Sequence, residues 1–483
     1  MQYRSIIRIL GMLVALFSVT MVPPAIVALI YKDGGGLPFV LAFILCLIIG
    51  LTFWYPNRKE KRDLKAREGF LIVVLFWTVL GSVGAIPFLL LENPEMRFAD
   101  AFFESFSGLT TTGATVITGI DFLPSSVKFY RQELQWLGGM GIIVLAVAIL
   151  PMLGVGGMQL YRAETPGPVK ESKMTPRIAD TAKHLWYIYV SLTLVCTFAY
   201  WAAGMSLFDA ICHAFATIAI GGFSTYDSSL GHFDSALING ICVFFLIISA
   251  VNFSLHYAVL RNRSILNYFR DPEFKTFVAI QFILTLMCFF VLLSKNITED
   301  FGDALDQALF QAVSISTTAG FSTENFSGWP LFLPILLIFS SFIGGCAGST
   351  GGGMKVVRIL LLYMQGIREL NRLVHPRAVF SIKLGRKPLS EKVIEAVWGF
   401  FAAYALVFVV IMLLLLMCGL DNISAFSATA ACLNNLGPGL GEVAVNYGSI
   451  SDTSKWVLMA AMLFGRLEIF TLLVLFTPAF WRA

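Results

Sequence analysis

The sequence predicts an all-α polytopic membrane protein. Four tandem units of helix, pore loop and helix are expected around a pseudo-fourfold pore, after two additional N-terminal transmembrane helices. Of the 483 residues, 57% are hydrophobic and only 13% are charged, and the mean hydropathy is +0.78. Soluble domains carry about 25% charged residues, so this chain is built for lipid. A short motif centred on glycine also recurs four times between apolar stretches.

Apolar runs of roughly the 20 residues that a membrane span needs recur along the chain. They cover residues 5–31, 37–56, 69–92, 129–152, 184–205, 235–260, 273–294, 330–364, 392–419 and 455–481. The first run follows Arg4 and Arg8, as in a signal peptide, but it reaches Ile30 without a clear small-residue cleavage site. We therefore expect a retained span, kinked at Pro23 and Pro24.

Basic residues gather in the loops after the second, fourth, sixth and eighth spans, whereas the other connections are shorter and more acidic. The positive-inside rule then places both termini in the cytoplasm. Four acidic residues lie near the predicted outer mouths: Asp209, Asp303, Asp306 and Asp421. They can cap helices, form a solvated loop face or add to an outer negative potential, and these roles stay open.

The third to tenth spans repeat one pattern: a span, an acidic outer stretch, a short semi-apolar segment, a glycine turn and a second span. The turns align on Gly113, Gly222, Gly320 and Gly437, at separations of 109, 98 and 117 residues (222−113, 320−222 and 437−320). This near-constant spacing indicates internal duplication. The predicted divisions are an N-terminal pair at 1–68 and pore units at 69–160, 161–262, 263–390 and 391–483.

Each short segment has the length for about half a bilayer only, so its turn lies at membrane depth. Irregular backbone survives there only when protein buries it or water reaches it, and four such turns are therefore expected to share one cavity. Rings of backbone carbonyls can replace the hydration shell of a cation, and glycine allows the conformations that aim them inward. The negative ends of the four short helix dipoles favour the same ion.

Six glycines interrupt the eighth span within Gly344–Gly353. Each lowers helix stability by about 1 kcal/mol relative to alanine, so the helix is expected to break there. Ser349 and Thr350 can satisfy part of the freed backbone. A movable gate and a static linker between two helices both fit this composition.

Arg466 lies near the middle of the last apolar run, where a charge is costly. Glu468, two residues away, points to a different face of a helix. Two roles therefore stay open for Arg466: a positive charge that faces the pore, and one partner of an ion pair with another helix.

At these residues the chain resembles the Trk, Ktr and HKT superfamily of potassium transporters, and most closely the membrane subunit of bacterial Trk systems. TTTGATV, AIGGFSTY, STTAGFSTENF and NNLGPGLG look like the four filter loops, and the two spans before Arg58 look like the additional pair of Trk subunits. The resemblance implies channel-like potassium uptake across the bacterial inner membrane, with K⁺ as the transported ion. It also implies a homodimer and a cytosolic ring of nucleotide-binding regulatory subunits.

The resemblance also assigns roles to single residues. One glycine per loop, in place of TVGYG, implies a short filter and less strict discrimination against sodium. The K⁺ filter, mainly backbone carbonyls, comprises Thr111, Thr112, Gly113, Ile220, Gly221, Gly222, Thr318, Ala319, Gly320, Asn435, Leu436 and Gly437. Phe342 to Lys355, FIGGCAGSTGGGMK, looks like the family's intramembrane gating loop. The gate residues implied are Gly345, Gly348, Ser349, Thr350, Gly351, Gly352, Gly353 and the pore-facing Arg466.

The main alternative is an ion-coupled secondary transporter, a cation symporter with a midplane site, because interrupted spans also mark substrate sites in that class. Such folds usually show two repeats rather than four. GCAGSTGGGMK lacks the Gly-Lys-Ser/Thr of a phosphate loop, which excludes ATP binding there. The eight scattered cysteines and five separate histidines favour neither an enzyme nor a bound cofactor. A net charge of +4 indicates no nucleic-acid partner.

Overall fold

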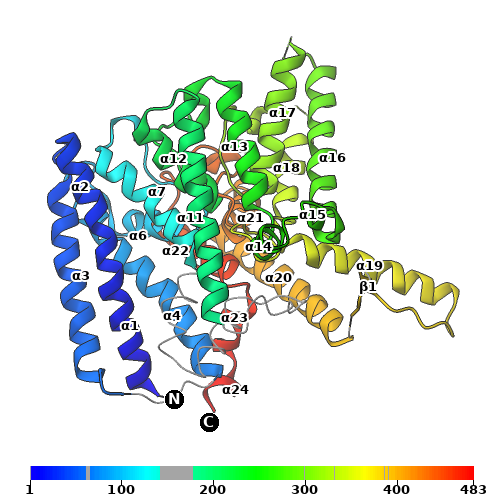
Figure 1. The fold of residues 1–483 in the computed structure, drawn as a ribbon, viewed down its shortest axis with the longest axis horizontal. Coiled ribbons are helices and arrows are strands. Elements are labelled where there is room, and N and C mark those ends of the chain that lie inside the picture. The colour runs from blue at the N-terminus through cyan, green and yellow to red at the C-terminus, as the bar shows by residue number, and fades with distance from the viewer. Residues whose placement is uncertain are drawn as a thin grey trace.

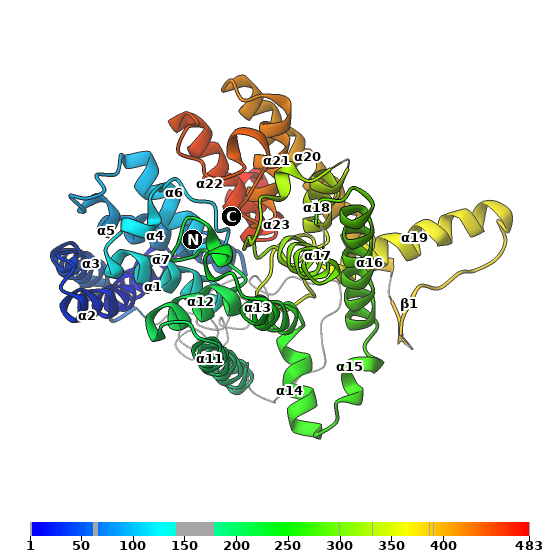
Figure 2. The ribbon, with the colours of Figure 1, turned by 90° about the horizontal axis from the view of Figure 1, so that it is seen from above.

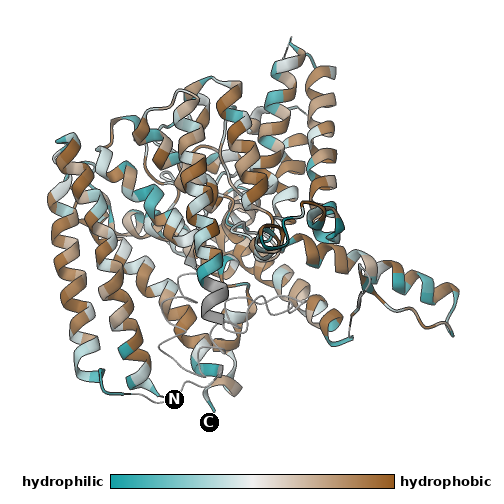
Figure 3. Ribbon diagram, in the orientation of Figure 1, coloured by the Kyte–Doolittle hydropathy of each residue, from teal (hydrophilic) through white to brown (hydrophobic). Residues whose placement is uncertain are grey.

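The computed structural model describes residues 2–60, 66–141, 178–298, 300–330, 332–385, 387–389 and 391–482. Helices dominate it, as the sequence predicts, and its one sheet is a two-stranded hairpin (Figure 1). Among these residues, six helices are long and apolar enough to cross a membrane, or eight if each of two sharply bent pairs is one span. Apolar residues cover much of the outer helix surfaces (Figure 3), as lipid requires.

The N-terminal pair is a tight helical hairpin. Its first arm comprises α1 (Tyr3–Ser18), the 3₁₀ turn η1 (Val19–Met21) and α2 (Val22–Tyr31), and its second arm is α3 (Gly36–Asn57). The 3₁₀ turn precedes the two prolines where a kink is predicted. Gly11 and Gly50 let the arms touch, because a Cβ on Gly11 would lie 2.8 Å from the Gly50 carbonyl oxygen.

Four groups of helices follow, and each contains one short inner helix. The first group is α4 (Ala66–Gly84), α5 (Ile86–Leu89), α6 (Phe98–Leu109), η2 (Ile120–Phe122) and α7 (Ser125–Gly139). The second is α11 (Ile178–Ala202), α12 (Leu207–Ala219), η5 (Ser229–Phe233), α13 (Ala236–Ser249), α14 (Phe253–Asn262) and α15 (Leu266–Arg270). The short inner helices of these groups are α6 and α12.

The third group is α16 (Pro272–Ser294), α17 (Phe301–Ser316), η6 (Phe326–Gly328), α18 (Leu333–Ser341), α19 (Val356–Val374) and the hairpin of β1 (Lys383–Leu384) and β2 (Lys387–Pro388). The fourth is α20 (Glu391–Met417), α21 (Asn422–Leu433), η7 (Gly441–Val443), α22 (Asp452–Arg466), α23 (Phe470–Leu473), η8 (Val474–Phe476) and α24 (Pro478–Trp481). Seen from above, the four groups surround a common centre, and the N-terminal hairpin packs outside the first (Figure 2).

Two predicted spans are not continuous helices. Residues 235–260 bend by 90° between α13 and α14, and residues 455–481 bend by 109° after α22. At the first bend, Asn252 caps α14 by accepting a hydrogen bond from the Ser254 amide. At the second, Glu468 and Ile469 have φ of 53° and 45°, so the helix cannot continue. The eighth span breaks between α18 and α19, as its glycines predict.

Part of the fourth predicted span, residues 142–152, lies outside the described residues, as does the chain that follows it up to residue 177. The two ends of the chain lie on the same side of the molecule (Figure 1). Helix α19 runs away from the body on one side (Figures 1 and 2).

Candidate functional site: a ring of four glycine turns

The four short inner helices, α6, α12, α17 and α21, end in the same way. In each, one residue takes a left-handed conformation: Thr111 (φ 56°), Ile220 (φ 55°), Thr318 (φ 71°) and Asn435 (φ 55°). The next residue then donates its amide to the carbonyl five residues back, as in Thr112 to Ser107 and Ala319 to Ser314. This is the hydrogen-bond pattern of a Schellman-type helix end.

Three of the four left-handed residues are β-branched, which makes them conformational outliers. Each such residue costs of order 1–3 kcal/mol and persists only where its surroundings hold it in place. The three residues are Thr111, Ile220 and Thr318, and each lies two residues before the turn glycine of its unit. The strain therefore has the same position in three units, which indicates a shared purpose in the turn.

The glycines that follow, with φ between 78° and 98°, close a ring. A Cβ on Gly113 would strike the carbonyl oxygen of Gly221, one on Gly222 that of Ala319, and one on Gly320 that of Leu436. A Cβ on Gly437 would lie 2.6 Å from the Thr112 carbonyl oxygen, which returns the circuit to the first turn. Each turn thus presents the carbonyl before its glycine to the glycine of another turn. The predicted common ring is what the structure shows.

The fourth turn differs from the others. Gly113, Gly222 and Gly320 are partly exposed, whereas Gly437 is buried. The hydroxyl of Tyr447 donates to the Gly437 carbonyl oxygen at 2.7 Å, and Pro438 approaches the Cβ position of Gly320 at 2.7 Å. The four turns therefore share one backbone conformation. They differ in the exposure of their glycines and in the groups that bond to their carbonyl oxygens.

In three units, a polar side chain nine residues before the glycine braces the chain that follows the turn. Glu104 accepts from the Val116 amide at 3.1 Å, the His213 Nε2 lies 2.9 Å from the Ser224 hydroxyl, and Gln311 Nε2 donates to the Glu324 carbonyl at 3.1 Å. Ala428 holds the equivalent place in the fourth unit, where Ser427 bonds both polar backbone groups of Leu440. The chain leaving each turn is thus tied to its own short helix.

Helix α7 adds a buried ion pair and an amide brace. Arg131 Nε donates to Glu104 at 2.7 Å, and both side chains are at most 1% exposed. Arg131 also donates to the Ser224 carbonyl at 3.2 Å and so joins the first and second turns. Gln135 donates to the Gly221 carbonyl at 2.5 Å and accepts from the Phe223 amide at 3.1 Å.

The intramembrane loop, Phe342–Lys355, touches three of the turns or the ends of their helices. The Thr350 hydroxyl donates to the Ile218 carbonyl at 3.0 Å, and the Gly352 amide donates to the Thr318 hydroxyl at 2.7 Å. The Gly353 amide donates to the Asn434 carbonyl at 3.1 Å. Ser349, Thr350, Gly351 and Gly352 are buried, so the loop fills the space against the ring.

One carboxylate ties the intramembrane loop to the start of α19. Glu273, at the start of α16, accepts from the Ala347 amide at 2.7 Å and from the Val357 amide at 3.1 Å. Inside the loop, the buried Lys355 ammonium donates to the Gly351 carbonyl. Gly345 and Gly348 lie beside Ala250 and Asn252, at the bend between α13 and α14. The loop and that bend therefore form one packed unit.

Arg466 joins the ring to the intramembrane loop. Its guanidinium donates to the Thr111 hydroxyl and to the Thr350 carbonyl, each at 3.2 Å, and also to the Gly138 carbonyl. Glu468 forms its ion pair with Arg358 of α19, so the poor geometry predicted for Arg466 with Glu468 agrees with the structure. Among the hydrogen bonds described above, those of Arg466 are the only link between the intramembrane loop and the first turn.

The comparisons with known proteins agree with this geometry. Residues 36–483 match the family described as TrkH, a cation transport protein. The chain belongs to the TrkH family. It is 66% identical to the Trk system potassium uptake protein TrkH of Vibrio parahaemolyticus and 63% identical to that of Escherichia coli strain K12, each over 100% of both chains. These relatives are named as transporters, not enzymes.

A TrkH crystal structure has the same fold. The potassium transporter TrkH from Vibrio parahaemolyticus superposes with a TM-score of 0.92 at 64% identity, covering 100% of both chains. Escherichia coli TrkG, also named a Trk system potassium uptake protein, is 40% identical over 99% of both chains. The predicted Trk-type family and helical fold are therefore confirmed.

Within this TrkH-family chain, the structure settles the open roles of two acidic residues. Asp421 caps α21 by accepting from the Ile423 and Ser424 amides. Asp209 is 7% exposed and accepts from the Thr225 and Tyr226 hydroxyls at 2.7 and 3.2 Å. Asp303 and Asp306 instead line a cavity.

Sequence reasoning missed the residues that hold the ring and the loop of this TrkH-family protein. They are Glu104, Arg131, Gln135 and Glu273. Ionisable residues inside apolar segments are costly and mark functional sites, and that signal points to Glu104, Arg131 and Glu273. No comparable sequence signal marks Gln135, because its role depends on a carbonyl 86 residues away.

Proposed function

We propose that this chain takes up potassium across the bacterial inner membrane, as the membrane subunit of a Trk-type system, through the ring of four glycine turns. The observation that carries the proposal is the closed circuit in which the carbonyl before each glycine meets the glycine of another turn. The two TrkH relatives above, at 66% and 63% identity, are named potassium uptake proteins. The four units at 69–160, 161–262, 263–390 and 391–483, after the pair at 1–68, each supply one turn.

The filter would select by backbone carbonyls. In each turn we assign the ion contacts to the carbonyls of three consecutive residues: the left-handed residue, the residue after it and the glycine. The left-handed residues are Thr111, Ile220, Thr318 and Asn435. Carbonyl oxygens replace part of the hydration shell, and four helix C-terminal ends add about half a negative charge each. One glycine per turn provides a short filter. The Tyr447 bond to the Gly437 carbonyl supports unequal contributions from the four units.

The intramembrane loop would act as the gate. It lies against the ring and bonds to the second, third and fourth units, which supports a closed state of the gate in this arrangement. Its gate residues are Gly345, Gly348, Ser349, Thr350, Gly351, Gly352 and Gly353. Opening breaks few hydrogen bonds, each worth about 1 kcal/mol net, so a modest force from outside the pore suffices. Arg466 adds a positive charge at the junction of ring and loop.

Regulation would act through α19, which continues directly from the intramembrane loop. The helix is anchored at its start by the ion pair between Arg358 and Glu468. It then leaves the body of the molecule on the side of the chain ends (Figure 1). We place this side and both termini in the cytoplasm, where nucleotide-binding regulatory subunits of the Trk system would bind and shift the gate between its states.

A second copy of the chain would cover part of α19. Four of its apolar side chains are 65–79% exposed: Tyr363, Leu370, Leu373 and Val374. An apolar row on a projecting helix suits a homodimer. Replacing Leu370 and Leu373 together by glutamate should convert the dimer to a monomer in a mass measurement of the purified protein. A dimer that persists in this variant contradicts the assignment.

The test of potassium uptake is a flux assay in liposomes that contain the purified chain. Potassium and rubidium should enter and sodium should enter less. Equal entry of all three ions would contradict selection by the ring. Electrical recording in bilayers separates the pore from the symporter, because a pore shows passive single-channel steps and a symporter shows a fixed coupling ratio between ions.

A further inference from the structure

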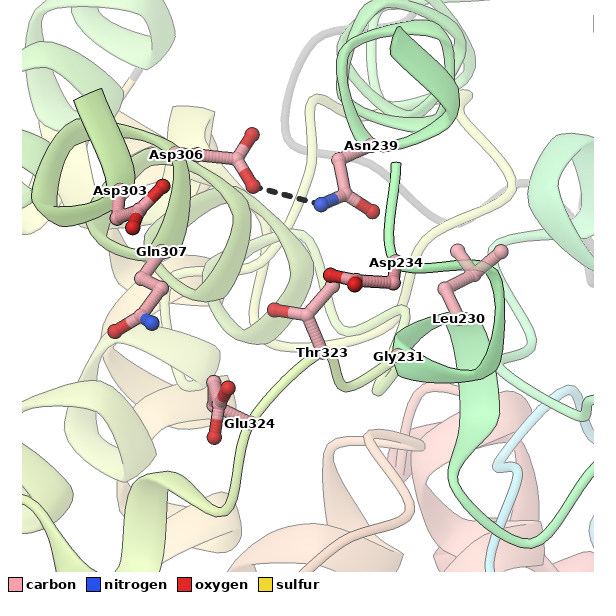
Figure 4. Close-up of a pocket in the computed structure, with 9 residues that line it drawn as sticks. All are labelled: Leu230, Gly231, Asp234, Asn239, Asp303, Asp306, Gln307, Thr323 and Glu324. Carbon is pink, nitrogen blue, oxygen red and sulfur yellow. Dashed lines mark hydrogen bonds between the residues drawn. The ribbon is translucent and has the colours of Figure 1, made fainter. Parts of the chain in front are cut away.

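A cavity of about 250 Å³ lies between the second and third units. It is formed by the start of α17 on one side and by the segment that joins η5 to α13 on the other (Figure 4). Four carboxylates line it, from Asp234, Asp303, Asp306 and Glu324, and none of the described residues that line it is basic. The cavity therefore offers a concentrated negative charge to any cation that enters.

A buried side chain in the wall of this cavity has an unused acceptor. Asn239 is 7% exposed, and its Nδ2 donates to the Asp306 carboxylate at 2.7 Å. Its Oδ1 has no hydrogen-bond partner within the described part of the chain, and it points away from Asp306 toward the side of Asp234 (Figure 4). The Thr323 hydroxyl, also in the lining, has no partner there either. A buried acceptor without a partner is unfavourable, and a donor from a bound group would satisfy it.

The cavity excludes some ligands by its chemistry. An anion would meet four carboxylates, and an apolar molecule would leave the acceptors unsatisfied. A directly coordinated metal is also a poor fit, because no three Asp, Glu, His or Cys side chains in the described ranges converge on a metal position. The remaining ligand is a cation that presents hydrogen-bond donors. A hydrated ion does so through its waters.

Among hydrated cations, the divalent class with tightly held waters fits best. Mg²⁺ gives up water reluctantly and usually keeps several waters when it binds a protein, and these waters can donate hydrogen bonds to carboxylates. At roughly 30 Å³ per water, the cavity has room for an ion with several waters. These carboxylates also attract a divalent cation more strongly than a monovalent cation.

We propose that this cavity binds a hydrated divalent cation of the Mg²⁺ type, held through its waters by the carboxylates of Asp234, Asp306 and Glu324 and the amide oxygen of Asn239. The site lies beside the third turn, because Thr323 follows Gly320 by three residues and Gly231 packs on the Thr323 carbonyl. It is separate from the ring and from the intramembrane loop. The proposal does not depend on potassium transport.

The test is a Mn²⁺ binding titration of the purified full-length chain, followed by the paramagnetic resonance signal of free Mn²⁺. The charge-removing variant is Asp234→Asn with Glu324→Gln, because neither carboxylate forms a hydrogen bond or ion pair with another described residue and asparagine tolerates the left-handed φ of 42° at 234. The matched control, Glu95→Gln with Glu442→Gln, removes the same charge from two exposed positions elsewhere. We expect the first variant to lose one Mn²⁺ site, with an affinity drop of at least about tenfold, and the control to keep it.

Competition identifies the type of ligand. Mg²⁺ and hexaamminecobalt(III), which mimics a hydrated ion and cannot lose its ligands, should both displace the Mn²⁺. Asn239→Ala should weaken binding by about tenfold through loss of the amide oxygen. Equal Mn²⁺ binding by the charge-removing variant and its control overturns the proposal. Failure of hexaamminecobalt(III) to compete overturns the water-mediated mode, and displacement by equimolar K⁺ overturns the divalent assignment. Each readout is binding, so it stands apart from any result on transport.

Discussion

The ring of glycine turns and the intramembrane loop both depend on glycine, but they are held in different ways. The turn glycines are walled in by the backbone of other turns, and side chains such as Glu104 and Gln135 brace the adjoining chain. The loop rests against the ring through single bonds from Thr350, Gly352 and Gly353. Gly352 meets backbone as closely, since its Cβ would strike the Asn434 carbonyl oxygen, so the two regions differ in their bracing. Side chains tie each turn to its own short helix, whereas a few bonds along one segment tie the loop to the ring. This difference is the one we expect between the proposed filter, which stays fixed, and the proposed gate, which moves.

The largest effect is expected from a side chain in the ring. Gly222→Ser places a Cβ against the Ala319 carbonyl and at a φ of 79°, so the turn must distort. At a strain of roughly 3 kcal/mol, potassium uptake should fall by about 100-fold. Gly240→Ser on α13 is the matched control, since its Cβ would meet nothing within 4 Å. Uptake in liposomes measures both, and full activity of the Gly222 variant would show that the ring is not the ion path.

The gate half of the comparison is tested by shortening the loop. Deleting Gly351 to Gly353 removes the amide bonds to the Thr318 hydroxyl and the Asn434 carbonyl. Two net hydrogen bonds of about 1 kcal/mol each correspond to a roughly 30-fold rise in basal flux without the regulatory subunits. A folded variant with unchanged flux and unchanged regulation would show that the loop is a static linker.

Removing the charge that joins the two regions should have a smaller effect. Arg466→Ala removes a positive charge beside the proposed ion path, and such a charge a few Å away costs an ion on the order of 1–4 kcal/mol. We expect cation flux to rise about tenfold, and Arg466→Lys to keep most of the barrier. Loss of assembly in the alanine variant, with normal assembly of the lysine variant, would favour a structural role for the hydrogen bonds to Thr111 and Gly138.

The smallest effect on transport is expected behind the ring. Glu104→Gln leaves the buried Arg131 without its charge partner, at a cost of about 3–5 kcal/mol in the free energy of unfolding. Thermal unfolding should register this loss, while the ratio of rubidium to sodium flux falls only a few-fold. Arg97→Gln breaks a pair whose arginine is 63% exposed, and it should change neither quantity measurably. Unchanged unfolding in the Glu104 variant would contradict the bracing role.

The sequence predicts the ring better than its supports. Four glycines in register suffice to place the turns in one cavity, because each backbone conformation is a local property of its turn. The bends after Ser249 and Arg466 carry no glycine or proline at the break, so pattern reasoning reads straight helices there. The left-handed Glu468 accompanies an ion pair with Arg358, 110 residues away. Contacts of such separation arise only when the units have assembled.

The most direct test combines the two regions in one chain. Rubidium uptake into liposomes is measured for Gly222→Ser, for the deletion of Gly351 to Gly353 and for both together. If ions pass through the ring before they reach the gate, the deletion alone should raise flux and the combined variant should conduct as little as Gly222→Ser. Flux in the combined variant equal to that of the deletion alone would place the ion path outside the ring and contradict the account.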